Sequence, residues 1–172
     1  MKLHLNIIIL AFTCLILSSC QSKTESNQKS QFQNTENTLP NFKMNDINGN
    51  TVSVQEEISK HKITIIDFWA SWCGPCMQEV PFMVELYSKY KDKGLGIIGI
   101  SLDKDEQKWK NTVKRMRMDW THISDLQGWH NTAAQMLGVD SIPFTIVVDD
   151  KGNILITGLR GEDLVAFVAN QL

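Results

Sequence analysis

A continuous apolar run that leads into two closely spaced cysteines constrains this chain more than any other feature. Residues 63–70 are apolar except for Thr64 and Asp67, a pattern typical of a central strand buried on both faces. Cys73 and Cys76 follow, and residues 77–90 then repeat apolar side chains at helical spacing. The cysteine pair is therefore expected where a buried strand passes into a helix.

The rest of the chain alternates predicted strands and helices. The sequence predicts a hairpin over residues 42–54 around Asn48-Gly49, a helical turn over 54–59, and Gly94 as the end of the helix that starts after the cysteines. The further strands expected are 95–102, 120–123, 144–148 and 154–157, and the further helices are 105–116, 132–137 and 164–172. This alternation predicts an α/β fold with a partly parallel sheet.

Composition and charge exclude several classes of protein. A net charge of −2 over 172 residues leaves no basic surface of the kind that nucleic acid requires, so no nucleic-acid partner is expected. Four cysteines, two of them in the first 20 residues, are too few for a small domain held together by disulfides.

The N-terminal segment is typical of export and processing. After Lys2, residues 3–17 are mostly apolar, and the segment Leu17-Ser18-Ser19-Cys20 resembles the lipobox of bacterial lipoproteins. This resemblance implies that residues 1–19 are a signal peptide and that Cys20 becomes the lipidated first residue. The alternative is an uncleaved N-terminal anchor. Both interpretations place the body of the protein outside the cytoplasmic membrane.

A polar tract separates this segment from the expected domain. Residues 21–38 are rich in Gln, Asn, Ser, Thr, Lys and Glu, and Phe32 is their only large apolar side chain. Too little apolar surface is present to offset the entropy of ordering, so residues 20–38 are expected to be a lipidated, disordered tether. The folded domain is then expected to cover residues 39–172.

The spacing of Cys73 and Cys76 favours redox chemistry. A helix N-terminus offers unpaired N–H groups and a partial positive charge, which stabilise a thiolate on Cys73, and Cys76 lies one turn further on. Pro75 suits the first helical turn because its missing N–H has no partner to lose there. Half of a zinc site is the alternative, but the sequence has no second CxxC motif or paired histidines, so no metal is expected.

The segment Asp67-Phe68-Trp69-Ala70-Ser71-Trp72-Cys73-Gly74-Pro75-Cys76 resembles the active site of thioredoxin. Pro81 matches the proline inside the helix of that family, and Ser141-Ile142-Pro143-Phe144 resembles its cis-proline loop. Together with the export signal, Glu79 and the extra helix and strand at 105–123, these motifs resemble the TlpA/ResA-like membrane-anchored thiol-disulfide oxidoreductases. The resemblance covers roughly residues 39–172 and implies a thioredoxin fold with an N-terminal β-hairpin and a central helix-strand insertion.

The resemblance also implies roles for individual residues. Cys73 is the exposed nucleophile, Cys76 is the buried resolving thiol, and their reversible disulfide is the only redox group, with no separate cofactor. The residues expected to contact the substrate are Trp72, Gly74, Pro75, Ile142 and Pro143, with Pro143 cis. Trp69 is expected to be a packing residue, and Trp120 and Trp129 are expected to pack in the core or in a loop.

Two acids are further candidates. Asp67 lies inside an apolar strand, where desolvation raises the pKa of a carboxyl group and suits it to proton transfer with Cys76. Glu79 matches the acid that the anchored relatives carry near the same cysteines; the alternative is a solvated charge on the helix surface.

The expected activity is extracytoplasmic reduction of protein disulfides, with apocytochrome c among the substrates of such relatives and an unidentified membrane protein as electron donor. A peroxidase of the related peroxiredoxin group is one alternative, but such enzymes need a Thr three residues before the reactive cysteine. In this chain that position is Ala70 for Cys73 and Cys73 for Cys76. A non-catalytic docking module with a thioredoxin fold is a second alternative. Such a module should have lost one of the two cysteines, and both are present.

Overall fold

A seven-stranded sheet forms the centre of the computed structural model, which describes residues 37–172. The strand order is β2-β1-β5-β4-β3-β6-β7. The strands are β1 (Lys43–Asp46), β2 (Thr51–Ser53), β3 (Ile63–Trp69), β4 (Leu95–Ser101), β5 (Thr121–Ser124), β6 (Phe144–Asp149) and β7 (Ile154–Thr157). β3, β4 and β5 run parallel to one another, whereas the other neighbouring pairs are antiparallel. The predicted α/β class with a partly parallel sheet is confirmed.

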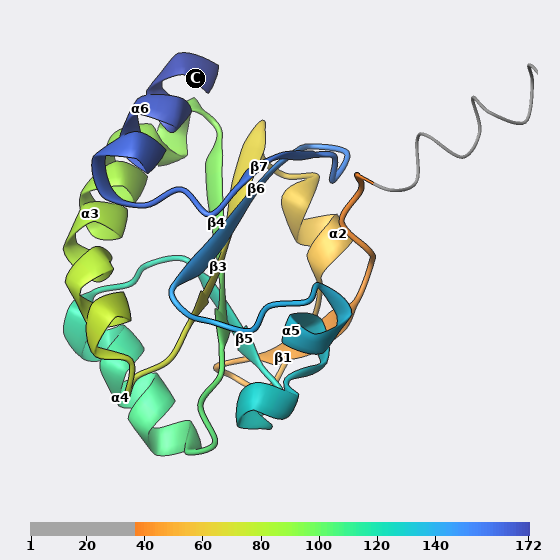
Figure 1. Cartoon of the computed structure of the whole chain (residues 1–172), viewed down its shortest axis with the longest axis vertical. Helices are drawn as coiled ribbons and strands as arrows, with labels where there is room; N and C mark the ends of the chain where they lie inside the picture. Colours follow the sequence, from red (N-terminus) through yellow and green to blue (C-terminus); the bar gives the residue numbers. More distant parts are fainter. Residues whose placement is uncertain (1–36) are drawn as a thin grey trace, which may run out of the picture. The chain divides into compact units, whose positions relative to one another are not determined.

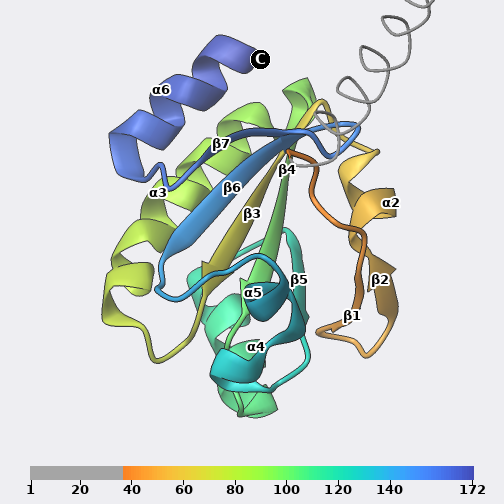
Figure 2. The same ribbon diagram turned by 45° about the vertical axis from the view of Figure 1, so that its right-hand side comes forward.

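Helices cover both faces of this sheet. They are α2 (Val54–Ile58), α3 (Gly74–Tyr90), α4 (Glu106–Met116), α5 (Thr132–Met136) and α6 (Gly161–Gln171). Figure 1 shows α3, α4 and α6 on one side and α2 and α5 on the other. In Figure 2, β1 and β2 form one edge of the sheet and β7 the other. The predicted N-terminal hairpin and the insertion that contributes α4 and β5 are both present.

β3 is buried along its whole length because it lies between β4 and β6 and is covered on both faces. Residue by residue, Ile63 to Trp69 pair with Leu95 to Ser101 of β4, and Phe68 pairs with Phe144 at the start of β6. This register brings the end of β3 and the start of β6 together, which is where the cysteine motif and the proline loop meet.

Gly94 ends the helical segment after the cysteines as predicted, and the largest difference from the predicted helix bounds at residues 54–59, 105–116, 132–137 and 164–172 is the start of α6. α3 ends at Tyr90, and a 3-10 turn, Lys91–Lys93, continues it to Gly94, whose φ of 112° only glycine adopts easily. α6 begins at Gly161 rather than at residue 164, with Glu162 and Asp163 in its first turn, where acidic side chains favour the helix dipole.

The residues Thr38–Leu172 form one compact unit. Within residues 37–172, none of the helices has both the length and the apolar character needed to cross a membrane. The predictions for the signal peptide, for Cys20 and for most of the tether concern residues outside the described part of the chain.

Candidate active site

Cys73 and Cys76 form a disulfide at the start of α3, with their Cα atoms 5.2 Å apart. Cys73 is the N-cap of this 17-residue helix, and its Sγ accepts a hydrogen bond from the backbone N–H of Cys76 at 3.2 Å. Pro75 lies in the first turn, as predicted. A sulfur that accepts from a helix N-terminus is in the position where negative charge is most stabilised, so the geometry favours Cys73 as the thiolate.

Both cysteines are nearly buried in this oxidised form. Cys73 is 5% exposed and Cys76 is 2% exposed, so the expectation of an exposed Cys73 is wrong for the disulfide state. The sulfur of Cys73 is bonded to that of Cys76 and lies 3.8 Å from the carbonyl oxygen of Ile142.

The loop before β6 completes the surroundings of the disulfide. The Ile142-Pro143 peptide bond is cis, as the resemblance implied. Pro143 is buried and Ile142 is half-buried. The carbonyl oxygen of Ile142 is the backbone atom that lies beside the Cys73 sulfur. Trp72 is 56% exposed next to the cysteines, and Gly74 and Pro75 are exposed as well.

Asp67 lies on β3 and is 8% exposed. Burial, together with the negative charge of Glu79, raises the pKa of its carboxyl group to about 7. A carboxyl group with a pKa near neutral can both accept and release a proton under ordinary conditions.

Glu79 lies three residues after Cys76 on α3, so the two share one face of the helix. Its side chain is half-buried, and its Oε2 accepts a hydrogen bond from the backbone N–H of Gly161 at 3.0 Å, at the start of α6. Glu79 is therefore not a freely solvated helix charge. Its negative charge adds to the effect of burial in raising the pKa of the Asp67 carboxyl group.

Residues 34–170 match the model of the Redoxin family. The chain belongs to this family. The Redoxin domain is 33% identical, over 123 residues, to the thiol-disulfide oxidoreductase ResA of Bacillus thuringiensis subsp. konkukian, which covers 72% of this chain and 68% of that protein. ResA of Bacillus subtilis is 26% identical over 131 residues, with 73% of this chain and 69% of that protein covered.

Solved structures agree with these sequence matches. A thiol-disulfide oxidoreductase from Bacteroides fragilis superposes on the Redoxin domain with a TM-score of 0.73 at 27% identity, covering 78% of this chain and 99% of the other. The thioredoxin domain of a thiol-disulfide oxidoreductase from Bacteroides vulgatus gives a TM-score of 0.70 at 30% identity, covering 77% and 94%. The predicted thioredoxin fold of the TlpA/ResA-like type is confirmed, and the chain is a thiol-disulfide oxidoreductase.

Sequence reasoning missed a buried acid behind the active-site loop of this Redoxin domain. Asp103 accepts hydrogen bonds from the Ser71 N–H at 2.9 Å, from the Ser71 hydroxyl at 2.6 Å and from the Ser101 hydroxyl at 2.7 Å. It therefore fixes the loop that carries Trp72 and Cys73 to the end of β4. A polar Ser-x-Asp sequence directly after an apolar strand was the available signal.

Trp129 was expected to pack in the core or in a loop, and it lies in the 3-10 turn Gly128–His130, outside the core of the Redoxin domain. It is 44% exposed, and its ring centroid lies 6.3 Å from that of Trp72. Trp69 and Trp120 are buried, as expected, and both rings contact His122, whose pKa burial lowers to about 3. No cluster of three or more His, Cys, Asp or Glu side chains suited to a metal ion occurs in residues 37–172.

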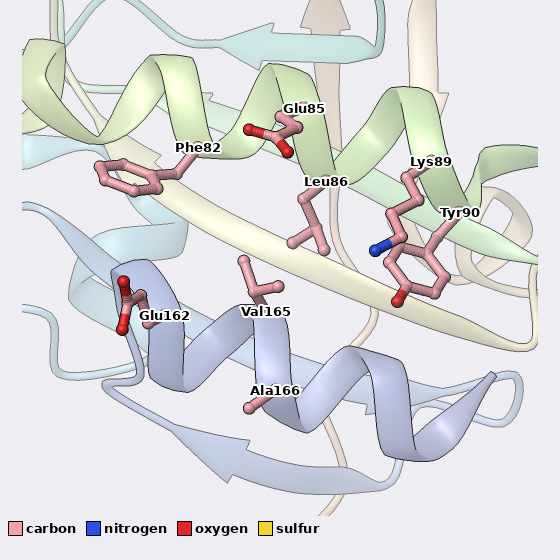
Figure 3. Close-up of a pocket in the computed structure, with 8 residues that line it drawn as sticks. All are labelled: Phe82, Glu85, Leu86, Lys89, Tyr90, Glu162, Val165 and Ala166. Atoms are coloured by element: carbon pink, nitrogen blue, oxygen red, sulfur yellow. The ribbon is translucent and has the colours of Figure 1, made fainter.

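A groove between α3 and α6 is separate from the residues predicted for the site. Leu86 and Val165 point toward one another across it (Figure 3). Its lining consists of Phe82, Glu85, Leu86, Lys89, Tyr90, Glu162, Val165 and Ala166. None of these side chains is a thiol, and none is one of the predicted site residues.

Proposed function

We propose that this thiol-disulfide oxidoreductase reduces disulfides of protein substrates outside the cytoplasmic membrane, with Cys73 as nucleophile and Cys76 as resolving thiol. The observation that carries the proposal is the Cys73 sulfur at the N-terminus of α3, where it accepts a hydrogen bond from Cys76 N–H. The redox-active group is the cysteine pair itself, and no other cofactor is part of the proposal.

The reaction proceeds from the reduced pair in two exchanges. The Cys73 thiolate attacks one sulfur of the substrate disulfide, the substrate S–S bond breaks, and the departing thiolate takes up a proton. Cys76 then loses its proton and attacks the Cys73 sulfur, which releases the second substrate thiol and forms the Cys73–Cys76 disulfide. Two electrons have passed from the protein to the substrate. A dithiol protein in the membrane returns the pair to its reduced form by the same exchange.

Asp67 is the proton acceptor for Cys76 in this proposal. Three observations support it: the Asp67 carboxyl group is buried, its pKa is raised to about 7, and it interacts with Glu79, which shares a helix face with Cys76. Trp72, Gly74, Pro75, Ile142 and Pro143 form the surface that contacts the substrate.

Cysteine variants test the two roles directly. Cys76→Ser should accumulate a covalent mixed disulfide with substrate, because only the resolving thiol releases the partner. Cys73→Ser should neither reduce insulin nor form adducts. Stable adducts from Cys73→Ser, and none from Cys76→Ser, would reverse the assignment. Activity that requires added peroxide would instead favour a peroxidase.

The proposed location rests on the N-terminal sequence. Residues 1–19 act as a lipoprotein signal peptide, Cys20 carries the lipid, and residues 21–38 are the tether of a domain that covers 39–172. Cytochrome c maturation is one process that needs such a reductase. Cys20→Ala should release the protein from membranes and leave its reductase activity unchanged. Quantitative sedimentation of this variant with membranes would contradict lipid anchoring.

A further inference from the structure

Two tryptophans form an exposed aromatic surface beside the disulfide. Trp72 is 56% exposed and Trp129 is 44% exposed, with ring centroids 6.3 Å apart and ring planes inclined by 58°. Exposed apolar side chains that lie together are more informative than single ones, and tryptophan is enriched among the residues that dominate binding energy at protein interfaces.

The loop that carries Trp129 is held by one carboxylate. Asp125 accepts hydrogen bonds from Gln127 N–H at 3.1 Å, from the Asn131 side-chain amide at 2.8 Å, and from both the backbone N–H and the hydroxyl of Thr132, at 2.8 and 3.0 Å. Asn131 is fully buried and also caps α5 through the N–H of Ala134. The chain is therefore held by Asp125 both before Trp129, at Gln127, and after it, at Asn131 and Thr132.

Two residues of the same loop have a left-handed backbone conformation. Leu126 has a φ of 58°, which is unfavourable for a residue with a side chain, and Gly128 has a φ of 59°. Gly128 directly precedes Trp129, and glycine adopts this φ without the strain that a side chain would bring.

A chain of hydrogen bonds connects the two tryptophan loops. Ser71, next to Trp72, donates to Asp103, which also accepts from the Ser101 hydroxyl. The Ser101 carbonyl accepts from the Ser124 hydroxyl at 2.8 Å, and the Ser124 oxygen accepts from Leu126 N–H at 3.1 Å. The relative position of Trp72 and Trp129 is therefore fixed by polar contacts as well as by the contact of their rings.

From these contacts we infer that Trp72 and Trp129 together bind a large apolar or aromatic side chain next to the cysteine of the polypeptide substrate. This inference rests on the proposed function. The occupant is a substrate segment because the surface is continuous with the reaction centre: Trp72 adjoins Cys73, whose sulfur lies 3.8 Å from the Ile142 carbonyl oxygen. Trp129 thereby sets which disulfides are reduced fastest.

Rate measurements on matched substrates test the inference. The prereduced protein is mixed with a peptide disulfide that has Phe next to the cysteine, with the same peptide carrying Ser there, or with hydroxyethyl disulfide, and thiol release is followed. Trp129→Ala should lower kcat/KM for the Phe peptide by about tenfold, mainly through KM, and change the rates for the other two substrates by less than about twofold. Trp129→Phe should retain most of the wild-type preference.

Leu155→Ala is the matched control because Leu155 is another exposed apolar side chain, 40% exposed on the edge strand β7. It should leave all three rates unchanged. An equal loss by Trp129→Ala on every substrate, or no loss on any, would overturn the inference. A dimer of the wild-type protein that Trp129→Ala dissociates would also overturn it, in favour of a second copy as the occupant. Failure of the wild-type protein to reduce any of these disulfides would instead contradict the proposed function.

Discussion

Asp67 and Glu79 are two carboxylates of one site with different surroundings. Asp67 is buried in the central strand, and no hydrogen bond from residues 37–172 reaches its carboxyl group. Glu79 is half-buried on α3 and accepts the N–H of Gly161, at the positive end of α6. Asp67 can therefore gain or lose a proton near neutral pH, because burial and the negative charge of Glu79 raise the pKa of its carboxyl group.

The largest expected effect concerns the dependence of stability on pH. The Asp67 carboxyl group has a pKa of about 7 in the folded protein against 3.8 for an ordinary aspartate, so the folded state retains a proton that the unfolded state loses. The stability that this group contributes is fully present below about pH 4 and is lost as the pH rises through about 7.

Asp67→Asn removes this titration. The stability of the variant relative to wild type should therefore increase by up to about 4 kcal/mol between pH 4 and pH 8. Urea unfolding of both oxidised proteins across this range measures the difference. Parallel pH profiles would show that Asp67 titrates normally, and the contrast with Glu79 would disappear.

The next effect is on the rate of resolution. Asp67→Asn should slow release of the mixed disulfide by about 100-fold near neutral pH, because Cys76 loses its proton acceptor. Formation of the mixed disulfide should change little, since the N-terminus of α3 stabilises the Cys73 thiolate without an acid. Stopped-flow traces separate the two steps, and the defect should shrink as the pH rises. An unchanged resolution step would leave Asp67 with a structural role only.

Glu79→Gln should have a smaller effect of a different kind. With the negative charge removed, the pKa of Asp67 should fall toward its ordinary value, so the rising limb of the resolution rate should shift to lower pH. The variant should also lose about 1 kcal/mol of stability, because a neutral amide is a weaker acceptor for the α6 N-terminus. Glu79→Asp, which keeps the charge on a shorter side chain, is the control. A pH profile that does not move would contradict the electrostatic coupling.

Local patterns in the sequence predicted the strands and the reactive pair. The apolar run at residues 63–70 indicated a buried strand, and the position of Cys73 at a helix start followed from that strand and the helical repeat after it. The raised pKa of Asp67 followed from its place in the strand. The local pattern was enough to predict these properties, although the burial and the Glu79 charge that raise the Asp67 pKa belong to the tertiary structure.

Contacts between distant segments could not be predicted in the same way. Glu79 meets Gly161 across 82 positions and Ser71 meets Asp103 across 32, and neither pairing leaves a periodic signal. The sequence left open whether Trp129 packs in the core or in a loop, because its exposure depends on the left-handed backbone at Leu126 and on the Asp125 contacts of the folded loop.

The smallest expected effect separates the two consequences of Glu79→Gln, which are the lower pKa of Asp67 and the loss of stability at the N-terminus of α6. Arg160 is the N-cap of α6, but its side chain makes no capping hydrogen bond. Arg160→Ser in the Glu79→Gln background supplies a hydroxyl acceptor at this helix end and should restore about 1 kcal/mol of stability. It returns no negative charge to the site, so the resolution profile should stay shifted to lower pH. Arg160→Ala, which supplies no acceptor, should restore neither property. If Arg160→Ser returned the pH profile to that of wild type, Glu79 would act on Asp67 by positioning α6 rather than through its charge.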